Sequence, residues 1–184
     1  MTAIEISRPA AVDMAPQAGS AITIVVYGTP AGQGQISFRG RGRGAYHTNG
    51  DRLLPWRRSI VDAALQTTGR HEFTAWRADR CACDVPKKQH ALFVGVPVHA
   101  EITITVEKPK SAPKRVRTWP ITRSSTDIDH HARACLDALS AAGVFVDDSQ
   151  VVRLTIGKGY PGEDADTLEQ PGAVIRVRQI GGVS

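Results

Sequence analysis

A run of alternating residues near the middle of the chain limits the choice of fold more than any other feature. Over residues 98–107, apolar side chains alternate with polar or charged ones; the apolar positions are Val98, Ala100, Ile102, Ile104 and Val106. This two-residue period predicts a strand with one face in a core and the other face in water. A sheet built around such a strand has one face available for a layer of helices.

Two helical patterns and three further strands surround this run. Apolar residues at helical spacing after Pro55, with Gly69 as a stop, predict a first helix, and an apolar stripe over residues 127–142 ending at Gly143 predicts a second. β-branched runs predict strands over residues 22–27, 151–156 and 174–180. We expect a loop over residues 31–50 and an irregular insertion over residues 70–95. The order predicts an α+β fold, a small mixed β-sheet with its helices packed on one face.

Length and composition favour one soluble domain. The chain has 184 residues; residues 1–20 are rich in Ala, Pro and Ser and predict a poorly ordered arm, so residues 21–184 are expected to form a single domain. No apolar stretch reaches the roughly 18 to 20 residues that a membrane span needs, and no signal-peptide pattern opens the chain. We therefore expect a cytoplasmic protein without a membrane partner. The three cysteines are expected to be reduced thiols.

The charge predicts a polyanionic partner. The net charge is +5 and the isoelectric point is about 9.4. Much of the excess lies in two basic runs, one with Arg39, Arg41 and Arg43 and one with Lys108, Lys110, Lys114, Arg115, Arg117 and Arg123. Both are interpreted as phosphate-facing loops, although a basic loop can also serve solubility alone.

Carboxylates flank the second predicted helix. Asp127 and Asp129 stand at its start, and Asp147 and Asp148 follow the extended residues after Gly143. If the chain doubles back along the helix, the second pair returns beside the first, and only one of Asp147 and Asp148 can face it. Clustered aspartates bind a hard divalent cation, Mg²⁺ or Mn²⁺, which assists phosphodiester hydrolysis. Alternatively, Asp127 and Asp129 cap the helix and Asp147 and Asp148 form a turn.

The segment TDIDHHARACLDALSAAGVFVDDSQVVRL, residues 126–154, resembles the signature of RusA-like Holliday-junction resolvases. That signature is a D-x-D-N-x-x-K segment, a D-A-L helix and a D-D-x-Q-V strand. The earlier VYGTPAGQGQISFRGRGRGAYHT also resembles the family's first strand and its glycine- and arginine-rich loop. Together with the strand at residues 98–106, the resemblance spans most of residues 22–180.

The resemblance implies roles for individual residues. Asp127, Asp129 and Asp148 would be the essential metal-binding carboxylates, with Asp147 secondary. The family's lysine falls on Arg133, which can neutralise charge on a reacting phosphate but does not readily release a proton. The family's asparagine falls on His130, so His130 and the adjacent His131 are candidates for a hydrogen bond or a metal ligand.

The resemblance further implies a homodimer that resolves four-way DNA junctions by two symmetric, Mg²⁺-dependent nicks, in a bacterial or phage-infected cell. Two alternatives stay open, a non-catalytic DNA-binding module and a less selective branch or flap nuclease of the same fold. A zinc site at Cys81 and Cys83 with His71 and His90 is disfavoured by its spacing, and a dinucleotide loop at Gly28, Gly32 and Gly34 is disfavoured because no helix follows.

Overall fold

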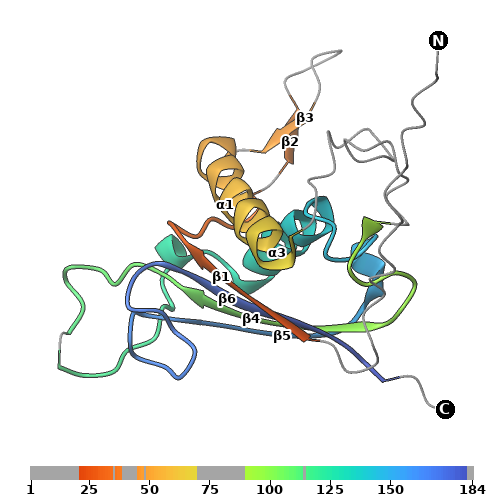
Figure 1. Ribbon diagram of the computed structural model, residues 1–184. Helices are drawn as coiled ribbons and strands as arrows, with labels where there is room; N and C mark the ends of the chain where they lie inside the picture. The colour runs from red at the N-terminus through yellow and green to blue at the C-terminus, as the bar shows by residue number, and fades with distance from the viewer. Residues whose placement is uncertain are drawn as a thin grey trace, which may run out of the picture.

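The described chain is a four-stranded sheet with two long helices stacked on one face (Figure 1). The computed structural model describes residues 21–34, 36–38, 45–47, 49–69, 90–113 and 115–181. The predicted N-terminal arm lies outside the described residues, as do residues 70–89 of the predicted irregular insertion. No helix in the described ranges is both long enough and apolar enough to cross a bilayer.

The sheet is mixed, as predicted. Its strands are β1 (Ala21–Tyr27), β4 (Val98–Thr105), β5 (Val151–Gly159) and β6 (Gly172–Gln179), in the order β1-β6-β4-β5. β4 and β5 run parallel, and β6 is antiparallel to both β1 and β4. β5 continues three residues past the predicted range of 151–156, because Gly157, Lys158 and Gly159 pair with the last residues of β4.

The alternation predicted for β4 is confirmed on its apolar side but not on its polar side. The apolar positions from Val98 to Ile104 are all buried, yet His99 and Thr105 are buried as well. Arg178 donates to His99 Nδ1 at 2.9 Å, so Nε2 donates to Thr155 Oγ1 at 3.0 Å, and Thr105 Oγ1 accepts from the Leu168 amide at 2.9 Å. Neighbouring strands and the loop before β6 therefore cover part of the face that was expected to be wet.

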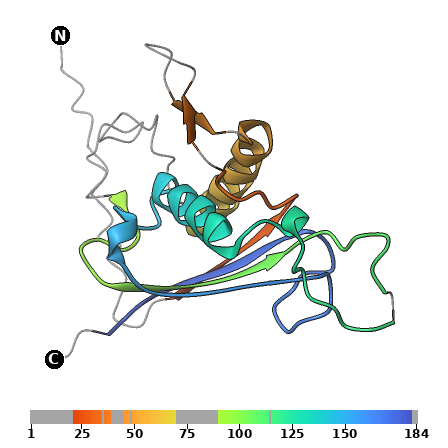
Figure 2. The ribbon, with the colours of Figure 1, turned by 180° about the vertical axis from the view of Figure 1, so that it is seen from behind.

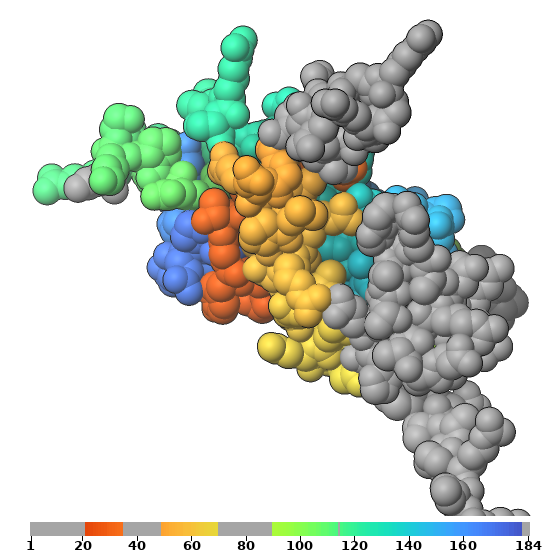
Figure 3. Space-filling model, turned by 90° about the horizontal axis from the view of Figure 1, so that it is seen from above, coloured from red at the N-terminus to blue at the C-terminus, as the bar shows by residue number. Residues whose placement is uncertain are grey.

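The two helices are α1 (Gly50–Thr68) and α3 (Ile128–Ala141), and both lie on the same side of the sheet (Figures 1 and 2). The space-filling view from above shows α1 across the middle of this face (Figure 3). α1 begins before Pro55, where the sequence predicted its start, and Pro55 lies inside it. Pro55 has no backbone N–H to donate to the helix, which costs stability. The burial of Leu53, in the added turn, and of Trp56 offsets this cost, because both side chains are fully or almost fully buried. The predicted stop is confirmed, since Gly69 adopts φ 63°.

The predicted loop at residues 31–50 contains structure that the sequence analysis missed. β2 (Ile36–Phe38) and β3 (Ala45–His47) form an antiparallel ribbon separate from the main sheet. Its strands have three residues each, too few for an alternating pattern to be detected among the glycines and arginines.

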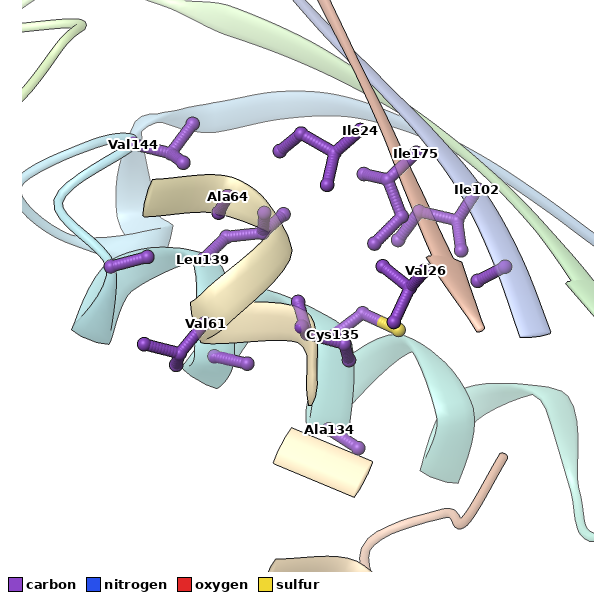
Figure 4. Packing of buried hydrophobic residues seen from close by; sticks show 14 of the residues in the cluster. Ile24, Val26, Val61, Ala64, Ile102, Ala134, Cys135, Leu139, Val144 and Ile175 are labelled. Atoms are coloured by element: carbon purple, nitrogen blue, oxygen red, sulfur yellow. The ribbon is translucent and has the colours of Figure 1, made fainter. Parts of the chain in front are cut away.

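The core lies between the helices and the sheet (Figure 4). Ala64 of α1, Leu139 of α3 and Ile175 of β6 belong to one buried cluster with residues of β1 and β4. Cys135 of α3 is fully buried in it, and burial raises the pKa of its thiol to about 12. Cys135 is therefore a packing residue, a free thiol as the sequence predicted.

Candidate metal centre and nucleic-acid interface

The chain makes an unusual turn just before α3. A short 3-10 helix, η1 (Arg123–Ser125), leads into Thr126, which adopts φ 60° and ψ 155°. Among the described non-glycine residues, Thr126 alone has a positive φ, and for a β-branched side chain this conformation costs on the order of 1–3 kcal/mol. Such strain persists only where surrounding contacts hold the residue in place.

Three side chains supply those contacts. The Lys158 ammonium, on β5, donates to the Thr126 carbonyl oxygen at 2.6 Å and to Ser125 Oγ at 3.0 Å. His131 Nε2 donates to the Ser125 carbonyl oxygen at 2.9 Å, and the single Ser125 hydroxyl hydrogen is shared between the carbonyl oxygens of Pro120 and Thr122, each 2.7 Å from Oγ. Burial lowers the pKa of His131, so its ring is neutral near pH 7. His131, a candidate ligand from the sequence, therefore has its donor nitrogen engaged by the backbone.

The strained turn presents two carboxylates and an imidazole to solvent. One ligand atom from each of Asp127, Asp129 and His130 lies within 4.8 Å of the others, and we call these three residues the candidate metal cluster. Asp127 occupies the N-cap of α3 with extended φ and ψ, but its side chain makes no capping hydrogen bond. Asp127 therefore does not cap α3 through its side chain. Its carboxylate instead lies close to that of Asp129 and to the His130 ring.

This donor set fits a divalent cation. Two carboxylates near each other repel, by roughly 4 kcal/mol at 4 Å and an effective dielectric constant of 20, and a cation between them reverses that repulsion. Carboxylate oxygens suit Mg²⁺ and Mn²⁺, and an imidazole nitrogen suits transition ions. Asp127 and Asp129 are exposed and His130 is half-buried, so the cluster is open to solvent.

A glycine loop packs directly against this cluster. The Gln33 amide donates to the His130 carbonyl oxygen at 2.9 Å, and Asn49 bridges the loop by bonding the Gly32 carbonyl and the Gly34 amide. A Cβ atom on Gly32 would lie 2.4 Å from Thr126 Cγ2 and 2.8 Å from His130 Cβ. Gly32, set aside in the sequence analysis as part of a weak nucleotide-loop motif, is thus required for close packing at the metal cluster.

Asp148 lies away from the cluster within one chain. After Gly143 the chain makes a bridge at Phe145 and a 3-10 turn, η2 (Asp148–Gln150), before β5 begins. Lys158, near the end of β5, contacts Thr126, and seven extended residues place the start of β5 about 23 Å from Lys158. Figure 1 shows η1 and η2 near opposite ends of the sheet. The prediction that Asp148 lies beside Asp127 is therefore wrong for a single chain. Strand β5, rather than residues 144–148, runs back towards the start of α3.

Asp147 and Arg133 have distinct settings. The Asp147 carboxylate accepts from the Ser149 amide at 3.0 Å and forms a capping box with Gln150, which gives it the structural duty expected for one member of the pair. Arg133 is exposed on α3, four residues after Asp129. Residues four apart share a helix face, so Arg133 lies on the same face of α3 as Asp129.

The predicted DNA-binding residues divide into three groups. Arg39, Arg41, Arg43 and Lys114 lie outside the described residues. Lys108 is engaged internally, since its ammonium bonds Glu163 and lowers the pKa of that carboxyl, and Arg117 pairs with Asp164 and stacks on Trp119. Lys110, Arg115 and Arg123 are exposed.

A basic cleft lies beside the cluster. It has a volume of about 330 Å³, and its lining includes three basic residues, Arg52, Lys108 and Lys110, and one acidic residue, Glu107, together with Ser124 and Ser125. Ser125 belongs to the strained turn that leads to Asp127, so the cleft adjoins the candidate metal cluster. Arg52 was missed by the sequence analysis because it lies outside both basic runs, and only the packing of α1 brings it here.

The described residues do not test the zinc site that the sequence analysis disfavoured. Cys81, Cys83 and His71 lie outside the described residues. Within the described ranges, the Asp127, Asp129 and His130 cluster is the group found with metal-ligand spacing.

Comparison with known proteins identifies the family to which the chain belongs. A search of curated proteins found no match. The model of the family described as Endodeoxyribonuclease RusA matches residues 56–178, which include most of α1, the sheet strands β4 and β5, and the whole metal cluster. The match covers well over half of the 184 residues, and the chain therefore belongs to the RusA endodeoxyribonuclease family.

Proposed function

We propose that this protein is a Mg²⁺-dependent endodeoxyribonuclease that resolves four-way DNA junctions as a homodimer, by one nick from each of two symmetric sites. The RusA family acts on branched DNA junctions. The observation that carries the proposal is the cluster of Asp127, Asp129 and His130 beside a basic cleft. We further propose that residues 21–184 form one nuclease domain after an N-terminal arm, and that it works on DNA in the cytoplasm of a bacterial or phage-infected cell.

The residues divide the work by charge. Asp127 and Asp129 would hold the cation, with Mn²⁺ as an alternative to Mg²⁺. When bound, a divalent cation polarises the scissile phosphate and favours ionisation of an attacking water. Arg133 would neutralise charge on the phosphate from the next turn of α3. Arg52, Lys110 and Arg115 would position the DNA backbone, together with the predicted basic loops that include Arg39, Arg41, Arg43 and Lys114.

Asp148 joins this proposal through the homodimer. α3 has 14 residues and a length of about 21 Å, which separates Asp148 from Asp127 in one chain. We therefore propose that Asp148 of each chain completes the cluster on a second copy. On this arrangement a single chain holds an incomplete site, and dimerisation and catalysis are coupled.

Cleavage assays test the reaction class. Wild-type protein is expected to cut a four-way junction with Mg²⁺ but not with chelator, and to leave a linear duplex and a flap substrate largely intact. Asp127→Asn and Asp129→Asn are expected to abolish cutting and to retain or tighten junction binding, because less negative charge faces the phosphates. Wild-type cutting rates in both variants would overturn the metal site, and equal cutting of duplex and flap would point to a less selective nuclease.

A mixing experiment tests the shared site. Asp129→Asn and Asp148→Asn proteins are each expected to be inactive on a supercoiled plasmid carrying a cruciform. After joint refolding, heterodimers would contain one intact site, so the mixture should give nicked circles, whereas the wild type gives linear product through paired nicks. An inactive mixture of proteins shown by mass measurement to exchange subunits would overturn the contribution of Asp148 from a second copy.

A further inference from the structure

His130 sits where the family resemblance places an asparagine, and its imidazole is part of the cluster with Asp127 and Asp129. The following inference rests on the proposed metal-dependent function and concerns which cation the centre prefers.

The spacing of His130 and Asp129 suits a shared ion better than a direct bond. His130 Nε2 lies 3.8 Å from Asp129 Oδ2, which is too long for a hydrogen bond. Two ligands that each lie about 2.1 Å from one ion are about 3.0 to 4.2 Å apart for angles between 90° and 180°. All the ligand atoms of the cluster lie within 4.8 Å of one another, so only small side-chain rotations are needed to bring every pair into that range.

The backbone of His130 is fixed while its ring remains accessible. The Gln33 amide bonds its carbonyl oxygen at 2.9 Å, and the close approach of Gly32 limits movement of its Cβ atom. The side chain is 32% exposed, whereas His131 is 1% exposed. Of these adjacent histidines, His131 supports the strained turn and His130 faces the carboxylates.

An imidazole changes the metal preference of an aspartate pair. Mg²⁺ prefers oxygen ligands, whereas Mn²⁺, Co²⁺ and Zn²⁺ also accept an imidazole nitrogen. We propose that His130 is a metal ligand alongside Asp127 and Asp129, and that it shifts the selectivity of this centre from Mg²⁺ towards Mn²⁺ and other imidazole-binding divalent ions. The asparagine expected from the resemblance would offer an amide oxygen and no such shift.

Metal titration of the full chain tests the selectivity. We would measure Mn²⁺ binding by the loss of the free-ion electron paramagnetic resonance signal, and Mg²⁺ binding by competition, for the wild type and His130→Asn. The variant is expected to lose on the order of tenfold or more in Mn²⁺ affinity and to keep its Mg²⁺ affinity within about twofold, so the ratio of the two constants changes. An unchanged ratio in a variant with a native circular dichroism spectrum would overturn the inference.

A spectroscopic measurement on the wild type avoids dependence on a variant. Pulsed electron paramagnetic resonance of bound Mn²⁺ should detect nitrogen coupling, which changes when the protein is labelled with ¹⁵N-histidine and disappears in His130→Asn. Absence of nitrogen coupling in Mn²⁺-loaded wild type would overturn ligation by His130.

The same titrations separate this inference from the proposed function. Asp127→Asn and Asp129→Asn are expected to weaken both Mn²⁺ and Mg²⁺ binding strongly. If these variants lose both ions and His130→Asn changes neither, the metal centre stands and the His130 assignment fails. If the aspartate variants bind both ions as the wild type does, the proposed centre itself fails.

Discussion

The Lys158 ammonium donates a 2.6 Å hydrogen bond to the carbonyl oxygen of Thr126, a residue 32 positions earlier in the chain. Thr126 has φ 60°, and the next residue, Asp127, carries a carboxylate of the metal cluster. The hydrogen bond therefore fixes a strained peptide whose conformation determines where that carboxylate points. Lys158 acts as a positioning residue in this arrangement.

Replacing Lys158 should weaken metal binding as well as the fold. We expect Lys158→Met to lower the free energy of unfolding by about 1–3 kcal/mol, since a charged donor to the backbone is removed. We also expect Mn²⁺ affinity to fall on the order of tenfold, because Thr126 is free to relax and move Asp127. Denaturant unfolding and Mn²⁺ titration measure the two effects.

Arg153→Met provides the matched control for Lys158→Met. Arg153 also lies on β5, but an odd number of residues away from Lys158 and so on the other face of the sheet. Arg153→Met should leave Mn²⁺ affinity unchanged. A Lys158→Met protein that loses stability while binding Mn²⁺ as the wild type does would show that Lys158 has only a structural role.

Gly32→Ala should disturb the metal cluster without removing any of its ligands. The added methyl group would lie 2.4 Å from Thr126 Cγ2 and 2.8 Å from His130 Cβ, so the loop or the turn must shift. We expect at least a tenfold loss in the single-turnover cutting rate, since misplacements of about 1 Å cost that much or more. Gly157→Ala is the control, because a Cβ atom there meets nothing within 4 Å; equal rates for both variants would contradict the packing argument.

The basic cleft should contribute to DNA affinity by binding phosphates. We expect Arg52→Ala and Lys110→Ala each to weaken binding at every sequence, and each to reduce the slope of log affinity against log salt by about one, the change expected when one phosphate is no longer neutralised. Fluorescence anisotropy at several salt concentrations measures the slope. Arg153→Ala serves as the control on the opposite face of the sheet, and wild-type slopes in both cleft variants would place the DNA path elsewhere.

Local patterns predicted the elements well where burial and spacing agreed. The strand at Val98 and the helix ending near Gly143 are confirmed, because their side-chain periods are set by the core they face. The predicted start of α1 was wrong. Pro55 was expected at the first helical position, but the helix begins earlier and buries Leu53. The short ribbon of β2 and β3 carries too few residues for a period.

Long-range contacts around the metal cluster could not be predicted from the sequence. Asp127 and Asp129 lie two residues apart, so their proximity follows from the motif, whereas Lys158 and Arg52 reach the site only through the packing of β5 and α1. The path after Gly143 was predicted by length alone, which cannot distinguish a return along α3 from a turn into β5. The predicted position of Asp148 was wrong for that reason.

A catalytic role and a purely helix-stabilising role for Arg133 predict different effects of its replacement. It stands four residues after Asp129 on α3 and is exposed, so its guanidinium can orient that carboxylate and reach a phosphate oxygen. We expect Arg133→Lys to keep substantial activity, because the positive charge remains and the family's residue is restored. Arg133→Ala should lose several orders of magnitude in cleavage rate, because charge that develops on the phosphate is left uncompensated.

If Arg133 served only the helix, Arg133→Ala would lower stability by a few tenths of a kcal/mol and leave the cleavage rate unchanged. Single-turnover cleavage of a four-way junction at saturating metal distinguishes these outcomes, and a near-normal rate for Arg133→Ala would exclude Arg133 from catalysis.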